Sequence, residues 1–92
     1  MSDNDFSIAL VNVKHGAKIA RAGWNAGGQF VVLQPGYPDG VPANANTATA
    51  FGVTEGETVR IRPYLALRTA DGSIVPWAPT VSDVLADDWR TV

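Results

Sequence analysis

The chain has 92 residues, a length that accommodates one folded domain and excludes a second. It contains no cysteine, which excludes a disulfide framework and a zinc ribbon. Nine acidic against seven basic side chains give a net charge of −2. That sign is wrong for a surface that follows the phosphates of duplex nucleic acid, so we expect no such partner.

Charged residues make up only 17% of the chain, below the roughly 25% that is typical of soluble domains. A small domain with so few charges has too few charged side chains to cover its surface. This favours an oligomer over a monomer, because apolar surface can then be buried between copies of the chain. No apolar run approaches the roughly 20 residues that cross a bilayer, and the segment Met1–Asp5 is acidic where a signal peptide is basic. We therefore expect a cytoplasmic protein with no membrane partner.

The first predicted element is a helix from about Asp5 to His15. Phe6, Leu10 and Val13 recur at the spacing of an amphipathic helix, and Gly16 is placed to end it. A short extended segment over Lys18–Ala22 follows.

A turn cluster of small and polar residues over Asn25–Gly28 separates that segment from a second strand over Gln29–Leu33. The second strand is apolar on both faces, so we expect it to be central in a sheet. The segment Pro35–Gly56 shows no strand pattern and predicts a long functional loop. Within this loop, a short helix over Asn44–Phe51 is predicted to end at Gly52. Farther on, alternating apolar and arginine residues over Val59–Arg62 indicate a brief, half-exposed strand.

The residues Tyr64–Trp77 predict a β-hairpin, because Asp71–Gly72 is a frequent two-residue turn between strands. A two-residue turn places Arg68 opposite Val75 and puts Arg68 diagonally beside Trp77 on one face. That arrangement suits a planar ligand and equally suits a surface cation–π pair. The opposite face carries the residues expected in the core, Leu65, Leu67 and Ile74.

A last helix is predicted to begin after Thr80, with Asp83 completing a capping box. The helix residues expected to face inward are Val81, Val84 and Leu85. The residues Trp89–Val92 are predicted to return as a final strand. Together these elements predict an α+β fold: a small antiparallel sheet with an N-terminal helix and a short C-terminal helix, in a single domain over residues 1–92.

Few side chains suit catalysis. A lone His15 without cysteine forms no Cys-His pair, and no second histidine accompanies it to hold a metal. Glu55 and Glu57 flank Gly56 in a predicted turn, where solvated charges are the better interpretation. Neither glycine-rich phosphate-loop pattern is present. We therefore expect no catalytic residue, no metal and no cofactor.

Aromatic and polar side chains gather instead in the turns, at Arg21, Trp24, Asn25, Arg68, Trp77, Thr80 and Asp83. Tryptophan faces stack on bases, arginine pairs with phosphates, and amide or carboxylate groups recognise ribose and base edges. Such a set suits a nucleotide-like small molecule. The residues alone leave open the alternative that Trp24, Trp77 and Trp89 are core anchors without a ligand.

Seven short sequence pieces occur in a recognisable order over nearly the whole chain: Ala20–Asn25, Pro35–Gly40, Asn44–Ala48, Arg62–Leu65, Thr69–Gly72, Val75–Trp77 and Asp83–Trp89. In this order they resemble the Thoeris anti-defence two-like family of phage and prophage proteins. The resemblance implies a sponge: a non-enzymatic protein that binds a cyclic nucleotide immune signal, glycocyclic ADP-ribose or in some members a cyclic oligonucleotide, without cleaving it. It also implies a homotetramer with ligand pockets between protomers, acting in the cytoplasm of the bacterial host.

Transferred to this sequence, the resemblance favours Arg21, Trp24, Asn25, Trp77, Thr80 and Asp83 as ligand-binding residues, beside Arg68 of the hairpin. The roles we infer are adenine stacking by Trp24 or Trp77, phosphate binding by Arg21 or Arg68, and ribose or base-edge contacts by Asn25 and Asp83. One position departs from the family pattern, because Val81 stands where relatives usually have glutamine. The rival interpretations are a structural or adaptor protein of a phage and a cyclic-nucleotide hydrolase.

Overall fold

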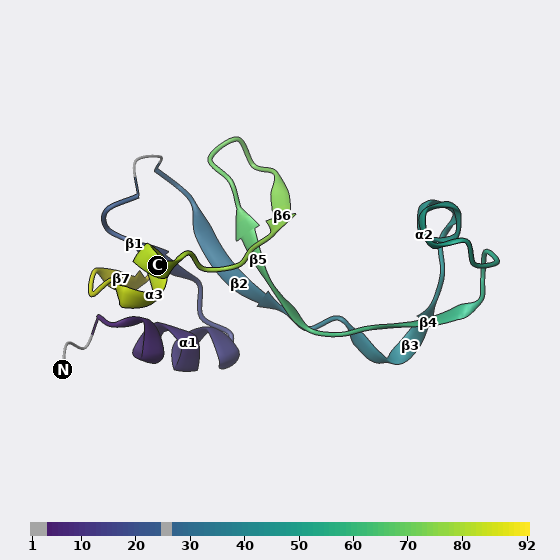
Figure 1. Ribbon diagram of the computed structural model, residues 1–92, viewed down its shortest axis with the longest axis horizontal. Coiled ribbons are helices and arrows are strands. Elements are labelled where there is room, and N and C mark those ends of the chain that lie inside the picture. Colours follow the sequence, from purple (N-terminus) through teal and green to yellow (C-terminus); the bar gives the residue numbers. More distant parts are fainter. Residues whose placement is uncertain (1–3, 25–26) are drawn as a thin grey trace.

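The computed structural model of the protein describes residues 4–24 and 27–92. These residues form three helices and seven strands (Figure 1). In chain order they are α1 (Phe6–Lys14), β1 (Ile19–Arg21), β2 (Phe30–Gln34), β3 (Tyr37–Pro42), α2 (Ala45–Phe51), β4 (Thr58–Ile61), β5 (Tyr64–Arg68), β6 (Ile74–Pro76), α3 (Val81–Leu85) and β7 (Trp89–Thr91). The α+β class predicted from the sequence is confirmed.

Five strands form one antiparallel sheet in the order β6-β5-β2-β1-β7. The strand β2 is central, as its apolar residues predicted, and it pairs with β5 over its whole length. The N-terminal strand β1 lies beside the C-terminal strand β7, with Ala20 opposite Arg90. The first and the last strand of the chain are therefore neighbours in the sheet.

The core lies between one face of this sheet and helix α1, which packs across β7, β1 and β2. Its largest fully buried side chains are Val13, Ile19, Val31 and Trp89. The helix forms as predicted: Asp5 caps its first turn by accepting the Ile8 N–H at 2.9 Å, and the chain leaves the last turn through Gly16 at φ 98°.

The opposite face of the sheet, which we call the uncovered face, carries no helix of the described chain. Side chains alternate between the faces of a strand, so the residues next to the core positions point to this side. They include Ala20, Phe30, Arg68 and Arg90.

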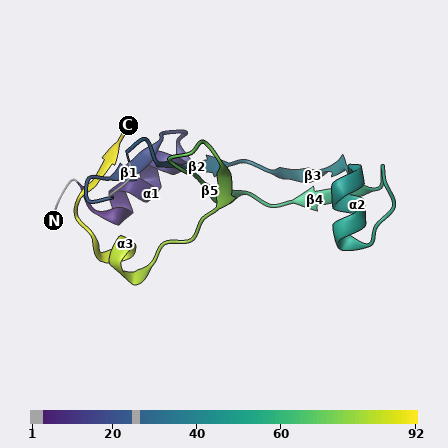
Figure 2. The same cartoon turned by 90° about the horizontal axis from the view of Figure 1, so that it is seen from above.

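Strands β3 and β4 form a second, two-stranded sheet that projects from the first with α2 at its far end, and we call this unit the arm (Figure 2). The molecule measures 48 × 27 × 22 Å, and its radius of gyration is 15.8 Å. A compact chain of this length has a radius of about 12 Å. The chain enters the arm at Gly36, where φ is 65° and a side chain would collide with the Ile61 carbonyl. Only glycine suits this crossing.

The predicted loop over Pro35–Gly56 is wrong in its first part, because Tyr37–Pro42 forms β3. In its sequence YPDGVP only Tyr37 and Val41 favour a strand, since proline, aspartate and glycine are depleted in strands, and the pairing with β4 is irregular between Tyr37 and Val41. Proline is tolerated there because a two-stranded sheet leaves one side of each strand unpaired. The short helix in this segment is confirmed, with Asn44 as its N-cap and Gly52 in the left-handed region.

The hairpin forms, but its predicted register is wrong by one residue. Arg68 lies opposite Ile74 instead of Val75. Thr69 pairs with Ser73, and Gly72 alone of the two turn residues has a positive φ, so the loop has three residues instead of two. The shift separates Arg68 from Trp77, which pairs with Leu65 and points to the core face. It also leaves Ile74, a predicted core residue, 68% exposed.

The last helix is capped as predicted, but its apolar residues do not face inward. Val81 is 76% exposed and Leu85 is 77% exposed, and Val84 is exposed as well, whereas Asp83 is buried. The reason is the capping box together with an ion pair, which turn the Asp83 side of α3 toward the sheet. The predicted final strand is confirmed as β7.

Candidate functional site

Five of the seven predicted site residues lie in one connected group, in which strand β1 and the residues after it meet α3 and β7. They are Arg21, Trp24, Trp77, Thr80 and Asp83. Arg68 is separate, on the uncovered face near the hairpin turn at Gly72. Asn25 lies outside the described residues.

Arg21 is held by two carboxylates. Its Nη1 donates to Asp83 Oδ1 at 2.9 Å, and its Nε donates to Asp88 Oδ1 at 2.8 Å. The second oxygen of Asp88 accepts the Gly23 N–H at 2.8 Å. These contacts raise the pKa of Arg21, chiefly through Asp88. The guanidinium therefore fastens β1 and the residues that follow it to α3 and to the turn before β7.

Asp83 serves two structural functions at once. Its carboxylate accepts the Thr80 N–H at 3.0 Å, while Thr80 Oγ1 accepts the Asp83 N–H at 3.1 Å. Burial works against the charged form, but the hydrogen bonds from Thr80 and Arg21 outweigh it, so the pKa of Asp83 is lowered. The hydrogen bond from Arg21 likewise lowers the pKa of Asp88. Both carboxyl groups are ionised at neutral pH.

Three tryptophans pack edge to face beside this ion-pair network. The ring centroids of Trp24 lie 5.5 Å from Trp89 and 6.4 Å from Trp77, and those of Trp77 and Trp89 are 6.0 Å apart. Trp89 is 1% exposed and donates from Nε1 to the Asp83 carbonyl at 2.8 Å. Trp89 is thus a core anchor, whereas Trp24 and Trp77 are only half-buried and keep ring surface accessible.

A depression of about 460 Å³ opens on the uncovered face beside Trp24. Ligand pockets commonly measure about 300–1,000 Å³. It is lined by Lys18, Ala20, Arg21, Trp24, Gly27, Gly28, Gln29, Phe30, Arg90 and Val92. Two of the predicted site residues, Arg21 and Trp24, are among them; Arg68, Trp77, Thr80 and Asp83 are not.

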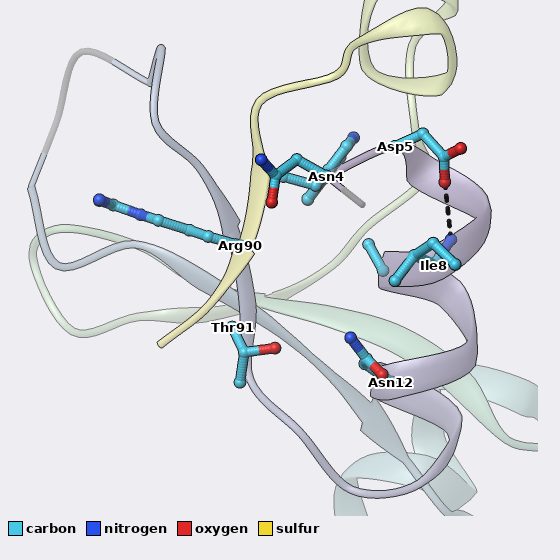
Figure 3. Close-up of a pocket in the computed structure, with 8 residues that line it drawn as sticks. Asn4, Asp5, Ile8, Asn12, Arg90 and Thr91 are labelled. Carbon is cyan, nitrogen blue, oxygen red and sulfur yellow. Dashed lines mark hydrogen bonds between the residues drawn. The ribbon is translucent and has the colours of Figure 1, made fainter. Parts of the chain in front are cut away.

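A second cavity lies at the start of α1 but holds only about 100 Å³ (Figure 3). That volume is too small for a nucleotide. Asn4, Asn12 and Thr91 give it a polar lining. Figure 3 also shows that the Arg90 side chain points away from α1. Of these two cavities, the depression beside Trp24 is therefore the candidate site.

Comparison with known proteins gives the family. The Thoeris anti-defense 2-like domain matches residues 4–92. A protein of Bacillus phage SP01 named Thoeris anti-defense 2 is 32% identical over 90 residues, which cover 95% of this chain and 92% of that protein. The chain belongs to the Thoeris anti-defense 2-like family. The resemblance carried by its short sequence pieces is confirmed, and the family is one of phage anti-defence proteins.

In this Thoeris anti-defense 2-like chain, eight of the ten residues that line the depression were not predicted as site residues, among them Lys18, Phe30 and Arg90. The Lys18 ammonium lies 5.0 Å from the centre of the Phe30 ring. Strand alternation places Lys18 and Ala20 on one face, but only the pairing of β1 with β7 brings Arg90 beside them. No local sequence pattern predicts that β1 pairs with β7.

The described part of the chain has no helix long and apolar enough to cross a bilayer. Within residues 4–24 and 27–92, no three metal-binding side chains are grouped. The imidazole of His15 contacts the backbone at the end of α1, where its Nδ1 lies 2.8 Å from the Val11 carbonyl oxygen.

Proposed function

We propose that this protein is an anti-defence sponge: it binds a cyclic nucleotide immune signal in the cytoplasm of the infected bacterium and withholds it from the defence effector. The family match over residues 4–92 carries the proposal. The ligand class is glycocyclic ADP-ribose, with cyclic oligonucleotides as the second class.

The depression beside Trp24 supplies chemistry that suits such a ligand. It combines an accessible tryptophan with the basic residues Lys18 and Arg90, in a protein whose net charge is −2. A base stacks on an aromatic ring, and phosphates pair with cations. A cyclic nucleotide also loses less conformational freedom on binding than an open one, which favours it over ATP or NAD.

The same geometry supports binding without cleavage. Asp83 and Asp88 are both ion-paired to Arg21, and both have lowered pKa values. A general base works best with a pKa near the operating pH, so these groups are poorly suited to accept a proton. We propose that the ligand dissociates from the protein without having been cleaved.

We further propose that the protein is a homotetramer assembled in part through the arm. Phe51 at the end of α2 is 79% exposed, Tyr37 is 55% exposed, and α2 has no buried residue. Thr47, Phe51, Val59, Arg60 and Ile61 line a groove of about 520 Å³ there. An exposed apolar patch of this kind is typical of an interaction surface, and a neighbouring copy would also deepen a ligand site that is shallow in one chain.

The test is thermal unfolding of the pure protein against linear and cyclic nucleotides, glycocyclic ADP-ribose included. A ligand at about 100 times its dissociation constant adds about 2.7 kcal/mol, which raises Tm by roughly 10 °C or more in a domain of this size. The bound material is then released by heat and identified by mass. Intact ligand supports the sponge, altered ligand indicates a hydrolase, and no shift across the panel favours a structural or adaptor protein.

A further inference from the structure

We infer that Lys18 and Arg90 form a phosphate-binding site on the uncovered face, in the depression beside Trp24. The inference rests on the proposed function, because it assigns the phosphates of the bound nucleotide to these two side chains. Neither residue belongs to the sequence pieces that identified the family.

The backbone brings the two cations together from opposite ends of the chain. Ala20 lies opposite Arg90, and the Val92 N–H donates to the Lys18 carbonyl at 2.9 Å. Lys18, directly before β1, and Arg90 of β7 are therefore diagonal neighbours across the strand pair, a spacing of roughly 7–8 Å that long side chains easily bridge. Ala20, opposite Arg90, lines the depression with only a methyl group.

The charges of Lys18 and Arg90 are available to an anion. In the described part of the chain, both ion pairs belong to Arg21, and neither Lys18 nor Arg90 contacts a carboxylate. Both side chains are exposed. Two unneutralised cations that line one depression of an acidic protein create a local positive potential.

The surroundings specify what kind of anion fits. The Phe30 ring lies under the Lys18 ammonium at 5.0 Å, and Trp24 lines the same depression. Aromatic surface beside paired cations suits a phosphate group attached to a flat heterocycle. Arg21, which the sequence assigned to phosphate, already donates from both Nη1 and Nε to carboxylates. A phosphate there would have to compete with Asp83 and Asp88.

In the test, inorganic pyrophosphate is titrated into the full chain. Binding is monitored by two-dimensional NMR of the backbone amides and the arginine Nε–H groups. Signals of Lys18, Gly27, Gly28 and Arg90 are expected to shift, and those of Arg60 and Arg62 in and beside the arm are not. The double variant Lys18→Ala/Arg90→Ala should weaken pyrophosphate binding at least tenfold, and Lys18→Arg/Arg90→Lys should retain most of it.

The matched control is Lys14→Ala/Arg62→Ala, which removes the same net charge from exposed positions outside the depression. It should bind pyrophosphate within about twofold of the unmodified protein. Absence of shifts at Lys18 and Arg90, or equal weakening in the two double variants, would overturn the inference. A nucleotide that binds equally well to Lys18→Ala/Arg90→Ala overturns this site while leaving the sponge intact. Pyrophosphate binding here without any nucleotide binding supports the site and rejects the sponge.

Discussion

Arg21 and Asp83 are 62 positions apart in the sequence, yet the guanidinium of one donates to the carboxylate of the other at 2.9 Å. Because Asp83 also caps α3 through Thr80, this single contact connects strand β1, the capping box and the helix. The family resemblance marks Arg21, Thr80 and Asp83 as ligand-binding positions. In the structure their polar groups are already engaged with one another, so their first effect is to fix the position of α3 relative to the tryptophans.

Replacement of Arg21 by alanine should destabilise the fold strongly. The change leaves Asp83 buried and charged without its cation, and loss of one partner of such a pair costs about 3 kcal/mol at a mostly buried site. Urea unfolding should show this loss, and Tm should fall by roughly 10–20 °C. Lys14→Ala serves as the control and should stay within about 0.5 kcal/mol of the unmodified protein. Equal stability of Arg21→Ala would mean that the ion pair contributes nothing.

Acid should weaken the fold through the same carboxylates. In the folded protein the pKa values of Asp83 and Asp88 are lowered, so at low pH the unfolded chain takes up protons more readily than the folded one. The stabilisation is complete above about pH 4, the ordinary aspartate range, and is lost as pH falls below it. Urea midpoints measured from pH 7 to pH 2.5 should show this decline. In Asp88→Asn the slope below pH 4 should be shallower, and an unchanged slope would assign the acid sensitivity to other groups.

The sequence predicted well where a local signal had a single interpretation. The Thr80–Asp83 capping box depends on residues three apart and formed as expected, and the short helix that was predicted to end at Gly52 formed as well. The hairpin register failed because Asp71–Gly72 fits a two-residue turn and also the last two positions of a three-residue loop. In the structure, Thr69 selects the longer loop: its side chain accepts the Ser73 N–H and donates to Asp71.

Non-local features of the site could not be predicted in this way. The Arg21–Asp83 ion pair and the neighbouring positions of Lys18 and Arg90 depend on β1 meeting β7, which join opposite ends of the chain. The exposed side of α3 was likewise assigned wrongly, because apolar residues usually face inward and the burial of Asp83 follows only from its partner on β1. The periodicity of apolar residues indicates which side of a helix tends to be buried. An ion pair with a residue that is distant in the sequence can override that tendency.

Val81→Gln should strengthen ligand binding without changing stability. The side chain is 76% exposed on the first turn of α3, so the substitution should alter the free energy of unfolding by less than about 0.5 kcal/mol. It introduces the glutamine that the family resemblance implies at this position, and an added amide can form a hydrogen bond to a ribose or a base edge. Titration calorimetry with glycocyclic ADP-ribose is the measurement. Leu85→Gln, at 77% exposed on the same helix, is the matched control and should leave affinity unchanged. If neither variant binds the ligand more tightly than the unmodified protein, position 81 is not part of the ligand site.

Phe51→Ala should weaken assembly while each chain stays folded. Phe51 is 79% exposed at the end of the arm, so little intramolecular packing is lost, whereas a buried aromatic anchor at an interface is worth about 2 kcal/mol or more. That loss corresponds to roughly a 30-fold weaker association, which sedimentation or light scattering at decreasing concentration should detect. Val11→Ala, at 52% exposed on α1, provides the comparison and should assemble normally. An unchanged mass for Phe51→Ala would place the interface elsewhere.

Trp24→Ala should weaken ligand retention and leave assembly intact, because Trp24 lines the depression and its ring is only half-buried. Stacking of one base on one aromatic ring contributes about 1–3 kcal/mol, so affinity should fall roughly 5- to 150-fold. The ring also packs edge-on against Trp77 and Trp89, and alanine removes that packing as well. Trp24→Phe separates the two effects: it preserves an aromatic face and should keep Tm and assembly close to those of the unmodified protein, with a smaller loss of affinity. If Trp24→Phe binds normally while Trp24→Ala loses ligand and assembly together, Trp24 acts as a core residue, and ligand recognition must then depend on other residues of the depression.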